Sequence, residues 1–600
     1  LLLSLPSLFS SLLSLSHLSL SLLSPRTQLA VTKATTRAAS LASPSVFSTA
    51  RSSCPSQAGS SCSSLLGHLP KMRRPDSHPS TLHHPLRREH FTEVAVIGNG
   101  PAGLSVSAFL SGLSPVYDSS HPHPDSRISQ HLQKRAFLPL IEQDLSWYAD
   151  SFDGSMRPMS ALYDSLARPF GDAVRGGLKD QPSTCLRWQV DPSRAVPHVV
   201  IGATPVGGSW NEYDPEMVAV SMGGWLDLPG FSVAQWMGNS RPTSSRLPAS
   251  MVVSYMRAYV KALGIESYMR DRTRVTSIER GGDDMGRGLP DPLWFVNTIG
   301  PDGEETVVIS RYLVLASGKM RSRRLQVEGE TEFADHIAYD IPAMRAIIER
   351  TYHSNTLNEA ESPSSSEDTV VVVVGDGVSA ADAVRICLQR GERVLHIVRK
   401  SDKELRSSML SRLSPTAYPE YNEVFRLMTG RIKNPLYEPR SSASIQRISG
   451  GSSGECVAEI KLVTGIEKVR FSVLAACIGK VDTLAEMMGD NQEFSFGADY
   501  TCNEDPTLFS VGSLAGDHFV RFLIGGCFQV TQHILRDYRA CLSPMAPCLT
   551  PPLGSDVAAL AEILRNTSIT DADLDALLDG RISTPSCEDS NSLPSCPCSC

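Results

Sequence analysis

The sequence predicts an α/β protein with two dinucleotide-binding, Rossmann-like domains, the second inserted into the first. Apolar runs at residues 94–97 and 370–374 each break into a glycine-rich turn, and a helix-like stretch follows each turn. A strand, a glycine-rich turn and a helix together open the βαβ unit that holds a dinucleotide. Further strand–glycine junctions at 471–479 and 508–512 indicate that the chain returns to the first domain after the second.

Changes in composition divide the 600-residue chain. Residues 1–90 are expected to be a low-complexity leader with the true start near Met72; a signal peptide is the alternative, but the segment lacks a basic region and is rich in serine. We expect residues 91–367 to form the first part of the first domain and residues 368–470 to form the inserted domain. Residues 471–540 should complete the first domain, and a Pro/Ser/Cys-rich extension should occupy 541–600.

Charge and cysteine content argue against several classes of function. The net charge of −8 comes from interspersed acids and bases, so we expect no nucleic-acid partner. No membrane span is expected, because serine makes up about a third of residues 1–23. The 14 cysteines are mostly single, which favours a reducing compartment and a cytoplasmic location. The spacing within residues 596–600 (Cys-Pro-Cys-Ser-Cys) matches no zinc site, so no metal is expected.

The first glycine-rich turn has the spacing Gly98-x-Gly100-x-x-Gly103, with Asn99 and Pro101 between the glycines. In a dinucleotide fingerprint the first glycine permits the tight turn, the second lets the backbone approach a pyrophosphate, and the third packs the helix on the strand. The helix N-terminus then supplies unpaired N–H groups to the anion. This turn is therefore the predicted FAD site, and an ordinary glycine turn is the alternative.

The acidic residue that would bind the ribose of this nucleotide is less clear. Asp118 has the best spacing, but the strand leading to it is short and contains Pro115. Pro115 and residues 121–124 (His-Pro-His-Pro) indicate an exposed loop. A solvated loop carboxylate is the favoured interpretation of Asp118.

The second turn follows five consecutive valines and has a fingerprint with alanine at its third position, formed by Gly375, Gly377, Ser379 and Ala380. The next strand, at 393–398, ends in Arg399 and Lys400. A carboxylate at that point would favour NADH, whereas cationic groups favour the 2′-phosphate of NADPH. We therefore predict NADPH at this turn; a solvated strand end is the alternative for Arg399.

Two such sites imply that hydride passes from a nicotinamide to a second bound group, for which flavin is the natural acceptor. Gly207, Gly208 and Trp210 form a tight turn that would place an aromatic ring near the flavin. Gly512 ends a strand, and Asp517 precedes a helix that begins near Phe519, where a carboxylate can accept from a ribityl hydroxyl. The alternatives are a core role for Trp210 and a helix N-cap for Asp517.

From about residue 93 to 536 the chain resembles the oxidative stress-induced growth inhibitor family, relatives of flavin-containing and N-hydroxylating monooxygenases. The most specific stretches are 96–103, 197–210, 370–383, 413–421 and 514–526, including the run Leu-Ala-Gly-Asp-His-Phe-Val-Arg-Phe at 514–522. The resemblance implies an FAD- and NADPH-dependent monooxygenase fold in a family tied to restraint of proliferation, cell death and cytokinesis.

Two departures from the wider monooxygenase pattern bear on activity. The identifying Phe-x-Gly-x-x-x-His run is present only as a compressed Phe-Ala-Asp-His at 333–336, and Ser221 replaces an amide side chain that often contacts flavin. No closely spaced cysteine pair follows the first turn, which argues against a flavin disulfide reductase. We expect oxygen transfer to a soft nucleophile of a small-molecule or protein substrate; the rival is a non-catalytic redox-sensing or scaffold regulator.

Overall fold

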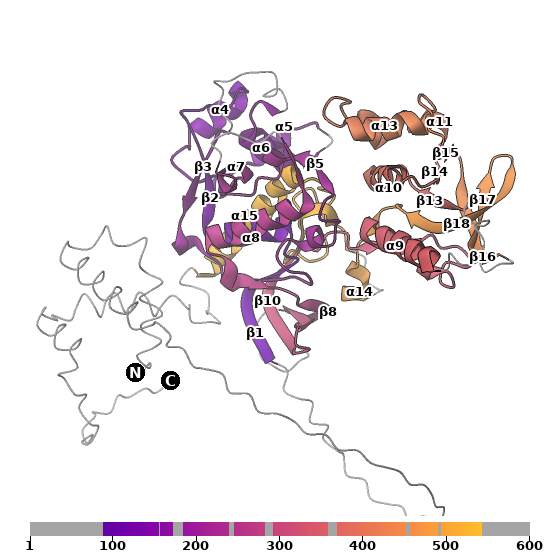
Figure 1. Ribbon diagram of the computed structural model, residues 1–600. Helices are drawn as coiled ribbons and strands as arrows, with labels where there is room; N and C mark the ends of the chain where they lie inside the picture. The colour runs from indigo at the N-terminus through magenta and orange to yellow at the C-terminus, as the bar shows by residue number, and fades with distance from the viewer. Residues whose placement is uncertain are drawn as a thin grey trace, which may run out of the picture. The chain divides into compact units, whose positions relative to one another are not determined.

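A computed structural model of the protein describes residues 88–154, 156–171, 184–238, 245–281, 292–357, 369–451, 456–489 and 494–542 (Figure 1). Most of the predicted leader (1–90) and of the C-terminal extension (541–600), including its cysteine cluster, lies outside the described residues. Residues 88–90 belong to the first strand of the described chain, and residues 541–542 belong to its last helix.

The first sheet is built around β1 (Arg88–Ile97). It pairs in parallel with β4 (His198–Ile201) on one side and with β10 (Glu305–Leu315) on the other. The sheet has the order β7-β4-β1-β10-β9-β8, where β7 is Met269–Arg270, β8 is Arg274–Gly281 and β9 is Leu293–Ile299. β20 (Leu508–Ser510) pairs in parallel with β10, so the chain does return to this sheet late in the sequence.

Side chains of helices pack on one face of this sheet, and side chains of β8, β9 and α14 (Leu484–Met488) pack on the other, so the end of β1 is buried and uniformly apolar. α3 (Pro101–Leu110) follows β1 directly and is buried along almost its whole length. α15 (Val520–Leu542) packs on α3 and on α6 (Pro158–Ala167). α8 (Ala249–Leu263) contributes a second apolar cluster.

The second sheet is built around β13 (Val370–Val374), which lies in parallel between β14 (Val394–Ile397) and β18 (Gly465–Ala476). β15 (Tyr437–Arg440) continues the sheet beyond β14, and β16 (Ser444–Gly450) and β17 (Cys456–Leu462) extend it beyond β18. The helices of this domain are α9 (Ile341–Leu357), α10 (Val378–Gln389) and α13 (Pro419–Met428).

The topology confirms the predicted fold class of two Rossmann-like domains, one inserted into the other. The chain leaves the first domain at β11 (Arg321–Ser322) and returns at β19 (Lys480–Val481), and these two short strands pair with each other. β12 (Ile337–Ala338) pairs with β18, so the second sheet takes in segments on both sides of residues 368–470.

Pro115 is a correction to the sequence-based expectation of an exposed loop. It is buried within β2 (Leu113–Tyr117), which pairs antiparallel with β3 (Leu186–Val190). A two-stranded sheet leaves an edge on each strand, and an edge tolerates a residue that cannot donate to the ladder. The loop begins only after β2.

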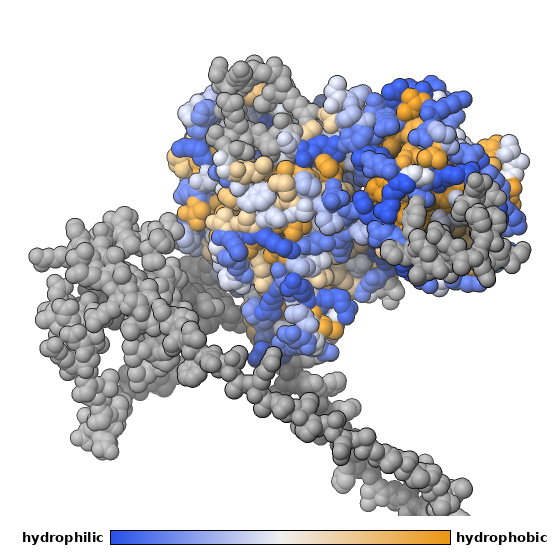
Figure 2. Space-filling model, viewed as in Figure 1, coloured by the Kyte–Doolittle hydropathy of each residue, from blue (hydrophilic) through white to orange (hydrophobic). Residues whose placement is uncertain are grey.

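In the described part of the chain no helix combines the length and apolarity needed to cross a membrane. Hydrophilic side chains cover much of the drawn face, with apolar side chains in separate groups among them (Figure 2).

Candidate functional site

The glycines of the first turn are required by close backbone approaches. Gly98 follows β1 with φ of +118°, and a Cβ atom there would lie 2.3 Å from the carbonyl oxygen of Ala316. A Cβ atom at Gly103 would lie 1.8 Å from the oxygen of Gly98. Gly100, by contrast, precedes α3 with its nearest neighbour, the Cα atom of Gly208, 3.8 Å from an added Cβ. The first and third glycines therefore serve the fold, and the second keeps space open.

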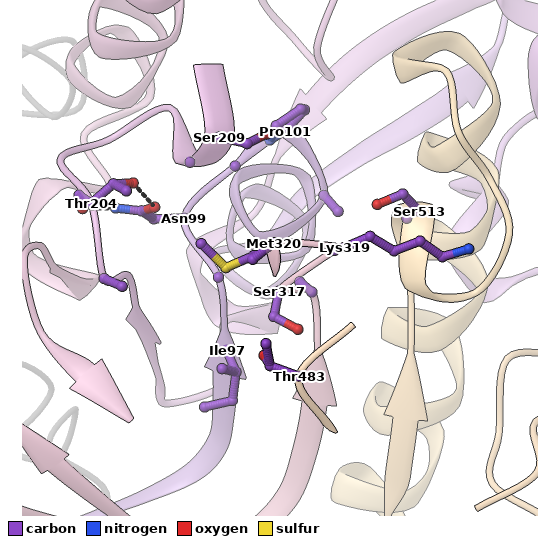
Figure 3. A pocket seen from close by; sticks show the side chains of 18 of the residues that line it. Ile97, Asn99, Pro101, Thr204, Ser209, Ser317, Lys319, Met320, Thr483 and Ser513 are labelled. Atoms are coloured by element: carbon purple, nitrogen blue, oxygen red, sulfur yellow. Dashed lines mark hydrogen bonds between the residues drawn. The ribbon is translucent and has the colours of Figure 1, made fainter. Parts of the chain in front are cut away.

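That space is a cavity of about 910 Å³ at the N-terminus of α3 (Figure 3). Segments far apart in the sequence meet on its wall. The predicted site residues that line it are Gly98, Asn99, Gly100, Pro101, Gly208, Trp210, Gly512 and Asp517. Gly103 lies behind the wall, and Gly207 donates its N–H to the oxygen of Asn99 at 3.0 Å. The structure thus brings one set of predicted residues together around a single space.

Asn99 ties the first turn to the loops that follow β4 and β7. Its side-chain amide nitrogen donates to the carbonyl oxygen of Thr204 at 2.7 Å and to Asp271 at 2.9 Å. The Thr204 hydroxyl donates to the Asn99 side-chain oxygen at 3.3 Å (Figure 3). Gly202 makes room for this amide, since a Cβ there would lie 2.1 Å from it. The buried Asn99 therefore fixes the conformation of the turn more than it faces the cavity.

Asp118 lies in a loop outside the parallel sheet. It follows β2, which pairs with β3 rather than with β1, and it is absent from the cavity wall. Hydrogen bonds from His121 and Ser120 lower the pKa of its carboxyl to about 2. On the side of β1 away from β10 the parallel neighbour is β4, where the spacing rule would place an acid, but β4 ends at Ile201 and Gly202 follows.

The part of the cavity wall that follows β10 was not predicted from the sequence. Ser317, Lys319 and Met320 line the cavity there, as do Thr483 and Ser513 (Figure 3). The Oγ atom of Ser317 is buried and has no hydrogen-bond partner among the described residues. The run 312–318, a strand ending in Ser-Gly, carried the signal, because parallel strands that flank β1 end at the same edge.

Asp517 and Gly512 contribute from the segment before α15. Gly512 has φ of +70°, and a Cβ there would meet the Cβ of Ala102 in α3 at 3.0 Å. The Asp517 carboxylate accepts from the hydroxyl of Tyr500 at 2.8 Å, and none of the described N–H groups of α15 donates to it. Burial raises the pKa of Asp517 above its usual value, although the hydrogen bond from Tyr500 opposes the shift.

Trp210 lies in a short 3₁₀ helix (Gly208–Asn211) and lines the cavity, while part of its ring packs on the cluster around α8. Its ring meets Tyr213 edge to face with centroids 5.5 Å apart. Ser221 is buried in β5 (Val218–Met222), off the cavity wall. Residues 333–336 lie beside β18 in the second domain, where His336 contacts the carbonyl oxygen of Ser472.

The second turn has the same backbone construction at the end of β13. Gly375 has φ of +131°, and a Cβ there would lie 2.3 Å from the oxygen of Cys477. Gly377 precedes α10 with nothing within 4 Å of an added Cβ, and Ser379 is exposed in the first turn of that helix. Ala380 is fully buried, as the third fingerprint position requires.

His396 supports this turn and was missed in the sequence. Its Nε2 atom lies 2.7 Å from the carbonyl oxygen of Gly375, and its Nδ1 atom lies 2.8 Å from the hydroxyl of Tyr437. Because a carbonyl oxygen can only accept, Nε2 carries the hydrogen and Nδ1 accepts from Tyr437. Burial lowers the pKa of His396 to about 4, so the ring stays neutral near pH 7.

Arg399 and Lys400 are exposed at the end of β14, beside the second turn. The Lys400 Nζ atom lies 2.6 Å from Asp376 in the turn itself. Among the described residues the Arg399 guanidinium has no hydrogen-bond or ion-pair partner. One free cation and one paired cation therefore flank the open face of the turn.

These features define an α/β protein with two dinucleotide-type turns, the first of which opens on a large cavity. No protein-family model matches the chain. It is 40% identical over 453 residues to the oxidative stress induced growth inhibitor homolog osgn-1 of Caenorhabditis elegans, covering 74% of this chain and 94% of that protein. It is 30% identical over 474 residues to human oxidative stress-induced growth inhibitor 1, covering 74% and 95%. The chain belongs to the oxidative stress-induced growth inhibitor family, as the sequence motifs predicted.

More distant similarities are weaker. An FAD-dependent monooxygenase of Pyrenophora dematioidea is 25% identical over 248 residues, 40% of either chain. Among solved structures, ornithine hydroxylase from Pseudomonas aeruginosa is 13% identical with a TM-score of 0.44, covering 76% of this chain and 100% of that one. Bacillithiol disulfide reductase from Bacillus cereus is 14% identical with a TM-score of 0.45, covering 75% and 100%.

Proposed function

We propose that the chain binds FAD in the cavity at the first turn and NADPH at the second turn, and that it is a monooxygenase-like flavoprotein of a growth-inhibitor family. The observation that carries the proposal is the meeting of Gly100, Ser317 and Asp517 on one wall at a helix N-terminus. The open backbone and the N–H groups of α3 suit a pyrophosphate. The unpartnered Ser317 hydroxyl and the Asp517 carboxylate suit ligand hydroxyl groups.

The bound flavin would supply the redox and oxygen chemistry, and the chain's own residues would position it. Gly98 and Gly103 hold the turn, Asn99 anchors it, and Asp517 accepts a hydrogen bond from the ligand. At the second turn, His396 orients the Gly375 carbonyl and Arg399 and Lys400 bind the extra phosphate of NADPH. The substrate would be a small molecule or protein group with a soft nucleophile, and we assign no catalytic acid or base to its oxidation.

Two further observations bear on the reaction class. The cavity wall in the described part of the chain contains no cysteine, which favours oxygen chemistry over dithiol reduction. The end of β4 lacks a ribose-binding acid, which is the feature that favours the rival function, a regulator that keeps the fold without catalysis.

Purified full-length protein tests the proposal. The enzyme should be yellow, with an FAD-to-protein ratio near one, and should consume NADPH in air with the flavin reduced under anaerobic conditions and reoxidised by O₂. A flavin that binds but is not reduced by NADPH would support the regulator. A folded, colourless protein that FAD does not bind would contradict the first site.

A further inference from the structure

Asp517 is held by two buried hydroxyl groups that come from other elements. The Tyr500 hydroxyl lies 2.8 Å and the Ser160 hydroxyl 3.3 Å from the same carboxylate oxygen, Oδ2. The two hydroxyl oxygens are 2.6 Å apart, and Ser160 also lies 2.7 Å from the carbonyl oxygen of Phe522 in α15. Among the described residues Oδ1 has no hydrogen-bond partner, although Asp517 lines the cavity.

Tyr500 is fixed in place by its surroundings. It is fully buried with φ of +71°, in the left-handed region that non-glycine residues rarely occupy. Its ring lies against Gly526 of α15, where a Cβ atom would come within 2.5 Å of it. The guanidinium of Arg157 covers the ring at 4.3 Å from the centroid. The hydroxyl therefore has little freedom to leave Asp517.

The hydroxyl hydrogens of Asp517, Tyr500 and Ser160 can be arranged in two ways in which each of them has an acceptor. When Asp517 is ionised, Ser160 donates to Tyr500 and Tyr500 donates to the carboxylate. When Asp517 is protonated, the carboxyl donates to Tyr500, Tyr500 donates to Ser160, and Ser160 donates to the Phe522 carbonyl oxygen. Each hydroxyl hydrogen is used once in either arrangement, so neither form leaves a buried donor unpaired.

We propose that Asp517 is the titrating group of the cavity and that Tyr500 and Ser160 form a reversible hydrogen-bond chain that holds its carboxyl in one position in both protonation states. The proton comes from solvent through the cavity and returns by the same route, because the chain ends at a backbone carbonyl. This inference rests on the proposed function, and the flavin site then contains a carboxyl that is a charged acceptor in one state and a neutral, weaker acceptor in the other, because its one hydrogen is donated to Tyr500. Tyr500 and Ser160 are positioning residues.

The surroundings of Asp517 shift the pKa of its carboxyl in both directions. Burial raises the pKa of the carboxyl, whereas the hydrogen bond from Tyr500 and the positive charge of Arg157 lower it, as does His518 when charged. Cys527, on the packed face of α15, is neutral because burial raises the pKa of its thiol far above its ordinary value. Burial is the largest of these effects, so Asp517 titrates above the range of an exposed carboxyl.

The proposed hydrogen-bond chain is tested by the affinity of the full-length apoprotein for FAD. This affinity is measured across pH by quenching of FAD fluorescence. Wild type should show one titration, and Asp517→Asn should abolish it. Tyr500→Phe removes the donor to the ionised form and should raise the midpoint by about one pH unit. Ser160→Ala leaves the Tyr500 hydroxyl hydrogen without an acceptor when Asp517 is protonated, so it should lower the midpoint of the titration. Tyr312→Phe, in the same core but off the cavity wall, is the matched control.

Opposite shifts from two neighbouring truncations are not expected from a merely structural role. Unchanged midpoints in both variants, or an intact titration in Asp517→Asn, would overturn the proposal. If FAD binds at no pH, the proposed function fails. Unfolding of the apoprotein then still tests whether Asp517 titrates as proposed. Because the folded-state pKa is raised, wild type should lose stability relative to Asp517→Asn as pH rises above the unfolded-state value of about 4. Parallel stability–pH curves for wild type and Asp517→Asn would contradict the proposed titration of Asp517.

Discussion

Lys400 forms an ion pair with Asp376, its Nζ atom 2.6 Å from the carboxylate, so a carboxylate within the second glycine-rich turn neutralises one of the two cations expected to bind NADPH. Both side chains are partly exposed, which limits the strength of such a pair to about 0–1 kcal/mol. A 2′-phosphate could displace the carboxylate at that modest cost.

The first prediction follows from this competition. Asp376→Asn should release Lys400 and tighten NADPH binding up to about fivefold, with little change for NADH. Dissociation constants for both coenzymes, measured by titration at low and high salt, provide the check. The gain should shrink as salt rises, because the pair is exposed. An equal gain for NADH would assign the effect to the shared pyrophosphate.

Removal of the cations should act in the opposite direction. Arg399→Ala and Lys400→Ala should each weaken NADPH by about 1–3 kcal/mol where a charged contact to the phosphate is lost. NADH lacks that phosphate and should bind as before. Arg431→Ala, at an exposed cation on another loop, is the control. Equal losses for both coenzymes would mean that Arg399 and Lys400 support the domain and do not read the phosphate.

The glycines of the first turn separate binding from folding. Gly100→Val should leave the apoprotein folded, since an added Cβ meets nothing closer than 3.8 Å, but its side chain should occupy the space that a pyrophosphate needs beside the turn and so exclude FAD. Gly103→Ala should instead lower the melting temperature, because its Cβ would overlap the Gly98 carbonyl. Flavin absorbance and thermal unfolding distinguish the two. Full flavin content in Gly100→Val would remove this turn from the site.

Burial of His396 predicts acid sensitivity. Its pKa is lowered to about 4, so the unfolded chain binds the proton more readily and stability falls as pH drops from about 6.5 toward 4. At pH 5 this amounts to about 2 kcal/mol. His396→Gln should therefore lose less stability between pH 7 and pH 5 than wild type, measured by urea unfolding. His336→Gln, at an exposed position, should follow the wild-type curve.

The two βαβ openings could be predicted because they are local: an apolar run, glycines at fixed spacing and a helix all lie within a short stretch of sequence. The partner of β1 could not, because a separate antiparallel strand pair and several helices lie between β1 and β4 in the sequence. The spacing rule therefore pointed to Asp118, which directly follows a strand that never joins the first sheet. His396 and Tyr500 were missed for a related reason, since their partners are set by strand neighbours and helix packing.

The last prediction separates enzyme from regulator and uses Asp517→Ala. Loss of a hydrogen bond to a charged group costs about 1.5–3 kcal/mol, so FAD affinity should fall roughly tenfold to a hundredfold. If the chain restrains growth through flavin chemistry, NADPH oxidation and growth restraint should fall in step with flavin occupancy. If it acts as a regulator without catalysis, oxidation should fall while growth restraint persists at equal protein levels.

Flavin content and oxidation rate are measured on purified protein, and growth restraint in cells with matched expression. Tyr312→Phe, in the same core but off the cavity wall, controls for general damage to packing. Full growth restraint by a folded Asp517→Ala protein without FAD would leave the nucleotide fold as a scaffold, and would contradict the enzyme assignment.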